Sequence, residues 1–202
     1  MENKKELRFE CTRCGSCCTD KNTLVNLTYL DILRIKNGLS LNLSEVLEIV
    51  GLYIYKIKIT TKELNKMVIS PLQTEKGPSF IGLIKDKRGF CCFYDEKNHK
   101  CLIYPLRPIF CRTFPFSFTY SSNKKKSEIE LFYTEKGKQY CPGIGFSAPI
   151  INLNKWIELG KKTIKELNKN FILIKEWNKS VKEGHIIPSI KNFLLNIFKL
   201  EY

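Results

Sequence analysis

Four cysteines stand within one short stretch near the start of the chain, and this stretch restricts the fold more than any other feature. They are Cys11, Cys14, Cys17 and Cys18, and Gly15 lies among them. An exposed thiol without a role is easily oxidised or exchanged, so this concentration indicates that the sulfur atoms are used. Three thiols at every third position around a glycine can turn toward one centre. The loop therefore predicts a metal site.

The spacing of Cys11, Cys14 and Cys17 is the one by which ferredoxin-type segments present three thiolates to one iron–sulfur cluster, with a fourth from elsewhere. The same two-residue spacing also suits a tetrahedral zinc ion. Adjacent side chains diverge in extended backbone, so Cys17 and Cys18 are not expected to bind one ion together. One of them is expected to face a second centre or to have a redox role.

The remaining thiols form a second group at Cys91, Cys92, Cys101, Cys111 and Cys141. Nine cysteines is an odd number, which does not suit a fully paired disulfide framework. The start of the chain shows no apolar segment typical of a secretory signal, so we expect a reducing cytoplasmic setting and metal ligation. Eight thiols would complete two four-thiolate sites and leave one spare, but the count is also compatible with a single cluster and several bystanders.

Composition sets limits on the fold and the partners. Apolar residues make up 43% and aromatic residues 12% of the 202 residues, which indicates one compact domain with a core. No apolar run approaches the roughly 20 residues of a membrane helix, so no membrane association is expected. The net charge of +14 allows an anionic partner such as nucleic acid. The lysines are scattered, however, and only 124–126 form a run, which favours a solvated surface.

Caps and alternating patterns predict short helices and strands up to about residue 150. The expected helices are 29–36, capped by Thr28 and stopped by Gly38, and 45–50, opened by Ser44 and ended by Gly51. The expected strands are 53–60 and 80–84, with a turn at 86–89, and a hairpin of 116–120 and 128–133 with a solvated tip at 121–126.

Helical periodicity replaces the cysteines after Asn152, which is the expected cap of a helix. Its apolar face is expected to contain Trp156, Ile157, Ile164, Leu167 and Phe171. Pro188 is expected to begin a last helix with a face of Ile190, Phe193, Leu194, Ile197 and Phe198. The sequence thus predicts an α+β fold with short antiparallel strands. Residues 1–150 would form a cysteine-cluster metal-binding domain, and residues 151–202 a helical region packed on it.

Three segments together carry a family resemblance. They are Cys91-Cys92-Phe93-Tyr94-Asp95, the run from Cys101-Leu102-Ile103-Tyr104-Pro105-Leu106-Arg107-Pro108 to Cys111-Arg112-Thr113-Phe114-Pro115, and Cys141-Pro142-Gly143. Read with Cys11 to Cys18, they resemble the CxxCxxCC (YkgJ-like) family of zinc- or iron-chelating cysteine-cluster proteins. The match runs in order from Phe9 to Gly143. The first segment aligns best at Cys91, which leaves Cys92 as the extra thiol.

The resemblance implies a cysteine-ligated metal, zinc or iron, and often an iron–sulfur cluster. The flagellin lysine-N-methylases look similar in their cysteine region, and they transfer methyl groups from S-adenosylmethionine. This chain has no convincing Gly-rich loop between a strand and a helix for such a cosubstrate, because Gly143-Ile144-Gly145 is too short and badly placed.

Charged residues in the second cysteine segment suggest how a thiolate centre would be stabilised. Arg107 and Arg112 are expected to lie beside Cys111, where positive charge lowers thiol pKa values and supports an anionic centre. Arg107 also fits a salt bridge that pins the turn between Pro105 and Pro108. His99 is close enough in sequence to Cys101 to supply a nitrogen ligand or a hydrogen bond.

Soft thiolate ligands select zinc or iron–sulfur over hard cations, and the scattered later cysteines favour one or two [4Fe-4S] clusters over zinc. We consider an iron–sulfur protein with a redox or macromolecule-modifying role and a protein or redox partner. The alternatives are an S-adenosylmethionine-dependent lysine methyltransferase and a structural zinc module that contacts nucleic acid. Whether the chain is an enzyme stays open. The predicted metal ligands, with Cys92 as a substitute, are Cys11, Cys14, Cys17, Cys18, Cys91, Cys101, Cys111 and Cys141.

Overall fold

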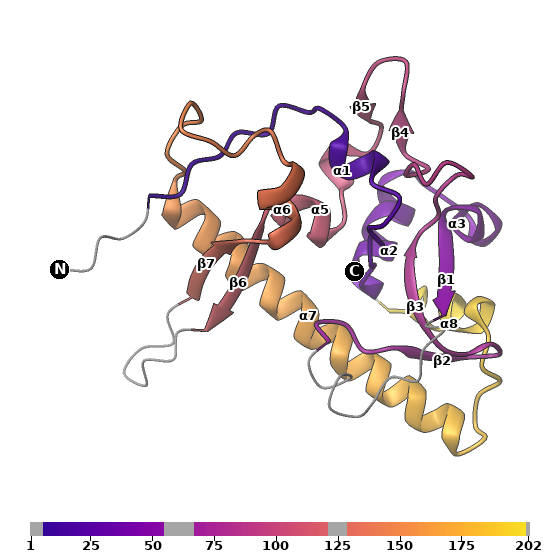
Figure 1. Cartoon of the computed structure of the whole chain (residues 1–202). Coiled ribbons are helices and arrows are strands. Elements are labelled where there is room, and N and C mark those ends of the chain that lie inside the picture. Colours follow the sequence, from indigo (N-terminus) through magenta and orange to yellow (C-terminus); the bar gives the residue numbers. More distant parts are fainter. Residues whose placement is uncertain (1–5, 55–66, 121–128, 201–202) are drawn as a thin grey trace.

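The computed structural model describes residues 6–54, 67–120 and 129–200. It has the expected α+β architecture of helices and short antiparallel strands in small sheets (Figure 1). The helices are α1 (Ser16–Thr19), α2 (Tyr29–Gly38), α3 (Leu43–Ile49), η1 (Tyr104–Leu106), α5 (Ile109–Thr113), α6 (Glu135–Tyr140), α7 (Leu153–Lys182) and α8 (Ile190–Ile197). The strands are β1 (Val50–Ile54), β2 (Leu72–Thr74), β3 (Gly77–Leu83), β4 (Tyr94–Asp95), β5 (Lys100–Cys101), β6 (Phe116–Tyr120) and β7 (Ile129–Tyr133).

The largest sheet has the strand order β1-β3-β2, and all its pairs are antiparallel. The central strand β3 is buried from Ser79 to Leu83, because it has neighbours along both edges. Beside its last residues runs the chain after α1: the Leu83 amide donates to the Val25 carbonyl oxygen at 3.0 Å, and the Leu27 amide to the Ile81 oxygen at 2.9 Å. The sheet therefore fixes the segment that follows the first cysteine loop.

The hydrophobic core lies between this sheet and the helices α2, α3, α7 and α8. Figure 1 shows α7 running along the base of the molecule, with the β6–β7 hairpin over its first half and β2 near its second half. The last helix supplies three fully buried apolar residues, Phe193, Leu194 and Ile197, as its pattern predicted. The core thus draws residues from both the cysteine-rich part and the helical part of the chain.

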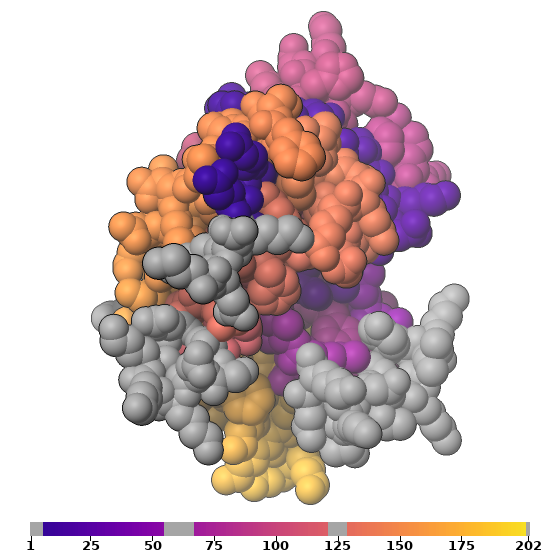
Figure 2. Space-filling model, turned by 60° about the vertical axis from the view of Figure 1, so that its left-hand side comes forward, coloured from indigo at the N-terminus to yellow at the C-terminus, as the bar shows by residue number. Residues whose placement is uncertain are grey.

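The β6–β7 hairpin packs closely on α7 through aromatic side chains. The Phe116 and Trp156 rings meet edge to face with centroids 4.5 Å apart, and Phe9 contacts both. Gly160 of α7 makes room for the Phe118 ring, since a Cβ there would overlap it. In the space-filling view of Figure 2, the indigo start of the described chain lies against the orange segment before α7. There the Phe9 amide donates to the Pro149 oxygen at 3.0 Å.

The predicted helix caps are correct at two sites and shifted at others. Thr28 caps α2 in a capping box with Asp31, and Asn152 caps α7. Asn42, not Ser44, caps α3, because its side chain and that of Glu45 bond reciprocally to each other's backbone amides. In the last helix the cap is Ser189, one residue after Pro188.

Two glycines expected as helix stops have other positions. Gly38 is the last residue of α2 and leaves space for the Leu106 side chain, whereas Gly51 lies in β1 opposite Gly82. The buried side of α7 also differs from the expected stripe. Phe171 is 54% exposed, while Thr163 and Asn170 are buried. Asn170 Oδ1 accepts a hydrogen bond from the Tyr29 amide at 2.9 Å, which explains a polar residue there.

The remaining strand and turn predictions are largely correct. β3 covers most of 80–84, and β6 and β7 match the predicted hairpin strands over 116–120 and 129–133. In the expected turn the Gly89 amide donates to the Asp86 oxygen. Of the strand predicted over 53–60, only the beginning coincides with β1. Residues 55–60 and the hairpin tip at 121–126 lie outside the described residues. Within the described ranges, none of the helices has the length and apolar character needed to cross a membrane.

Candidate metal centre

The first cysteine loop ends in the single turn α1, which Gly15 makes possible. Gly15 has a left-handed backbone with φ of 77°, and its carbonyl oxygen accepts hydrogen bonds from the Cys18 and Thr19 amides. The Tyr94 ring lies where a Cβ of residue 15 would be. Only glycine therefore fits both the backbone conformation and the space.

Backbone hydrogen bonds join this loop to later cysteine segments. The Cys91 amide donates to the Cys18 oxygen at 2.9 Å, and the Glu10 amide donates to the Gly143 oxygen at 3.0 Å. At Gly143 a Cβ would overlap the Glu10 carbonyl oxygen. A residue with a side chain would therefore keep the Cys-Pro-Gly segment farther from the loop. These contacts place the first cysteine loop between the segments that carry Cys91 and Cys141.

One cavity of about 170 Å³ gathers the cysteines at the junction of these segments. The cysteines that line it are Cys11, Cys14, Cys17, Cys18, Cys91, Cys101, Cys111 and Cys141. Cys92 is not among the lining residues and is exposed. All nine cysteines are free thiols. The cavity thus contains the eight thiols singled out from the sequence and leaves the substitute outside.

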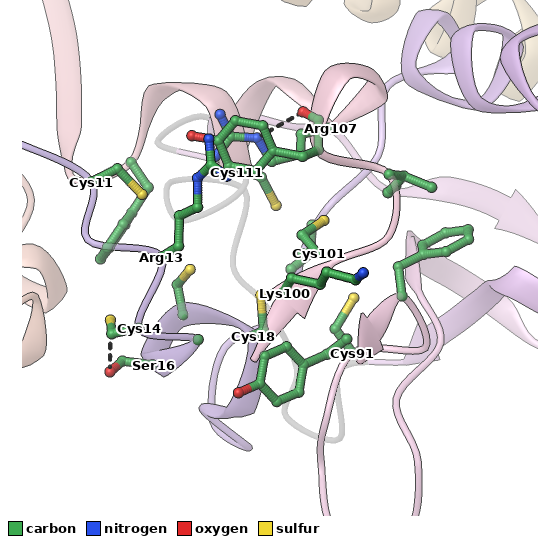
Figure 3. Close-up of a pocket in the computed structure, with 18 of the residues that line it drawn as sticks. Cys11, Arg13, Cys14, Ser16, Cys18, Cys91, Lys100, Cys101, Arg107 and Cys111 are labelled. Carbon is green, nitrogen blue, oxygen red and sulfur yellow. Dashed lines mark hydrogen bonds between the residues drawn. The ribbon is translucent and has the colours of Figure 1, made fainter. Parts of the chain in front are cut away.

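The lining thiols fall into two groups. Figure 3 shows the sulfur atoms of Cys18, Cys91, Cys101 and Cys111 facing a common space, with Cys11 and Cys14 on the other side of Arg13. Electrostatic coupling follows this division except at Cys17. Burial raises the pKa of Cys111, and charges on Cys17, Cys91 and Cys101 add to this effect. Burial likewise raises the pKa of Cys141, with contributions from Cys14, Cys17 and Cys11. Cys17 acts on both groups.

Neighbouring cysteines form two hydrogen-bonded pairs. A hydrogen bond from Cys18 lowers the pKa of Cys17 to about 7, and one from Cys92 lowers that of Cys91 to about 7. Cys17 and Cys18 both belong to the helical turn α1 and not to extended backbone, and their assignment to different centres stays a prediction.

The spacing and chemistry of the donors limit what the cavity can hold. Within residues 6–54, 67–120 and 129–200, no three His, Cys, Asp or Glu side chains are close enough together to hold one metal ion. Among the described residues no carboxylate lines the cavity, and its soft or nitrogen donors are the thiols and His99. This donor set fits a thiophilic metal and does not fit magnesium or calcium.

The positive charge in the cavity comes from Arg13, Lys100 and Arg107. The Arg107 Nε donates to the Tyr104 carbonyl oxygen at 3.1 Å, and its Cζ lies 3.7 Å from the centroid of the Tyr104 ring. Its charge favours the thiolate form of Cys17, Cys101 and Cys111 and so counteracts the rise in the pKa of Cys101 and Cys111.

Arg112 and His99 take different places. Arg112 does not line the cavity, and its guanidinium pairs with Glu166 of α7 at 3.5 Å. His99 does line the cavity, and its Nδ1 is 3.2 Å from the Tyr94 hydroxyl. Both residues lie close to a cysteine in the sequence, but only His99 lines the cavity that contains the sulfur atoms.

The sequence interpretation missed Asp31, which supports the helix that carries Cys111. The Asp31 carboxylate is fully buried, accepts from the Thr28 hydroxyl at 2.9 Å, pairs with Arg34 at 2.5 Å and accepts from the Ile109 amide at 2.9 Å. The signal for its local role was present, since an acidic residue three positions after a threonine cap is a capping box. The contact with Ile109 has no sequence signal.

Comparisons with known proteins agree with this chemistry. Residues 10–142 match the CxxCxxCC family, described as a "putative zinc- or iron-chelating domain". The chain belongs to this family. The resemblance inferred from the cysteine segments is confirmed, and the protein carries a zinc- or iron-chelating cysteine-cluster domain, formed by the CxxCxxCC segments around the cavity.

Among curated proteins, an uncharacterized protein of Methanocaldococcus jannaschii is 28% identical over 152 residues. The alignment covers 71% of this chain and 66% of that relative, so the CxxCxxCC chain spans less than two thirds of the relative's length. No solved structure matches the chain.

Proposed function

We propose that this CxxCxxCC protein binds a [4Fe-4S] cluster through Cys18, Cys91, Cys101 and Cys111. The observation that carries the proposal is the convergence of these four sulfur atoms, from four separate segments, on one cavity (Figure 3). Four cysteine thiolates are the usual ligand set of such a cluster. When bound, the cluster supplies one-electron transfer.

The distribution of the cysteines favours a cluster over a single zinc ion. Two CxxC pairs are the typical ligand pattern of a structural zinc site. Here Cys101, Cys111 and Cys141 are single and widely spaced in the sequence. Eight thiols line the same cavity, whereas one zinc ion binds four.

A second centre is proposed at the outer group of Cys11, Cys14, Cys17 and Cys141. Cys17 couples electrostatically to Cys111 and to Cys141, which supports two neighbouring centres. Arg107 would stabilise the anionic centre, because its charge already favours the thiolates around it. A redox role with a protein partner in a reducing, cytoplasmic setting suits free thiols, of which Cys11, Cys14 and Cys17 are exposed.

Oxygen-free purification followed by iron, zinc and acid-labile sulfide analysis tests the proposal. We expect a brown protein with about four irons and four sulfides per cluster, and an electron paramagnetic resonance signal after reduction. A colourless protein with stoichiometric zinc and no sulfide would exclude the cluster. The Cys14→Ser and Cys111→Ser variants then distinguish one centre from two, because the two residues belong to different groups of thiols. With two centres, each variant should lose only part of the metal.

A further inference from the structure

Two guanidinium groups share one aromatic ring at the cavity. The Arg107 Cζ lies 3.7 Å, and the Arg13 Cζ 4.7 Å, from the centroid of the Tyr104 ring. All three residues line the cavity. Figure 3 shows Arg13 rising between the two groups of sulfur atoms toward Arg107. The ring therefore holds two positive groups close together beside the thiols.

Neither guanidinium has a carboxylate partner among the described residues. By contrast, Arg34, Arg88 and Arg112 each form an ion pair with an acidic side chain. No Asp or Glu lines the cavity in the described part of the chain, and Lys100 adds a third cation to its lining. Cations placed together repel each other unless an anion lies between them. Arg107 already favours the thiolates of Cys17, Cys101 and Cys111, so the exposed Arg13 is the guanidinium left to meet an anion from solution.

The backbone at Arg13 supports a dedicated role for its side chain. Arg13 has φ of 56°, a left-handed conformation that is uncommon for a residue other than glycine. Such conformations persist where the surrounding structure enforces them, often at binding sites. Here the neighbours are Cys14 and Gly15, whose turn is fixed by its own hydrogen bonds. The exposed Arg13 is thus held over the cavity mouth.

We propose that Arg13 and Arg107 bind a small ligand with a carboxylate or phosphate group at the mouth of the cysteine cavity. A guanidinium offers two parallel N–H donors that match the oxygens of either group. Stacking on Tyr104 orders both guanidiniums in advance, which lowers the entropic cost of binding. The proposal rests on the proposed function in one respect only: the metal centre in the cavity lies beside the bound anion.

The test is calorimetric titration of the anaerobically purified, metal-loaded protein at low ionic strength, with inorganic phosphate in one arm and succinate in the other. We expect saturable binding of one probe, which identifies the anionic group preferred. Arg13→Gln should weaken that binding at least about tenfold, since a charge-assisted hydrogen bond is lost. Arg88→Gln is the matched control, because Arg88 is exposed and pairs with Asp86 and Glu96 outside the cavity.

Each outcome decides the proposal. It is overturned if the wild-type protein saturates with neither probe, if Arg13→Gln binds like the wild type, or if Arg13→Gln loses its metal, which would make Arg13 part of the metal centre. If Arg13→Gln does not fold, Arg13→Lys replaces it and should also bind more weakly, because lysine lacks the two-pronged donor. Iron, zinc and sulfide are measured on the same samples. If the protein contains zinc and binds the anion, the proposed cluster is refuted and the anion site is not. If the protein contains the cluster and binds neither probe, the anion site is refuted and the cluster is not.

Discussion

The buried carboxylate of Asp31 accepts a hydrogen bond from the Ile109 amide at 2.9 Å and so joins α2 to α5, the helix that carries Cys111. The same carboxylate pairs with Arg34, whose guanidinium also contacts Glu166 of α7 at 2.9 Å. Glu166 in turn pairs with Arg112. A chain of charged contacts therefore connects the helices α2, α5 and α7.

Asp31→Asn is expected to destabilise the protein by about 3 kcal/mol, because it removes one charge of a buried ion pair. Chemical denaturation of the metal-loaded protein measures this change. Glu158→Gln is the control, since its pair with Lys161 is exposed and should contribute less than about 1 kcal/mol. A loss in Asp31→Asn no greater than in Glu158→Gln would show that Asp31 does not anchor α5.

Arg107 and Arg112 allow a comparison of two arginines near the same cysteine. Arg107→Gln is expected to lower the reduction potential of the centre, because a positive charge that stabilises the thiolates is lost. Arg112→Gln should leave the potential unchanged, because the Arg112 guanidinium pairs with Glu166 and not with the thiols. Redox titration of both variants measures the potentials. Equal shifts of the reduction potential in the two variants would contradict the inference that only Arg107 acts on the centre.

The cysteine pattern and the family resemblance were sufficient to predict which thiols line one cavity, whereas their role as metal ligands stays a prediction. Eight predicted ligands line one cavity, and Cys92 does not. The caps at Thr28 and Asn152 were also predictable, since a cap depends on neighbouring residues only. Local chemistry thus carried most of the correct predictions.

Features that depend on tertiary contacts escaped the sequence. Phe171 fits an apolar stripe yet is exposed, while Asn170 is buried because it bonds to the Tyr29 amide of another helix. Arg112 follows Cys111 directly, but the helix α5 turns its side chain toward α7. In these cases the deciding partner is more than fifty residues away in sequence, and no local pattern encodes it.

Adjacent cysteines provide a matched pair of substitutions. Cys91→Ser is expected to reduce the bound metal, because Cys91 lines the cavity and faces Cys18, Cys101 and Cys111. Cys92→Ser should retain the metal content of the wild type, since Cys92 is exposed and lies outside the lining. Metal and sulfide analysis of both variants measures the difference. If Cys92→Ser loses metal and Cys91→Ser keeps it, the two residues must exchange roles.

Gly15→Ala is expected to destabilise the protein by about 1–3 kcal/mol and to reduce its metal content. The φ of 77° is strained for alanine, and the added methyl group would displace the Tyr94 ring from the cysteine loop. Gly145→Ala is the matched control: Gly145 follows the last cysteine segment, and a Cβ there meets no other atom within 4 Å. Thermal unfolding and metal analysis should therefore separate the two variants. Equal stability and equal metal content would mean that the turn at Gly15 does not position the thiols, because the loop could then accept a side chain without moving its sulfur atoms.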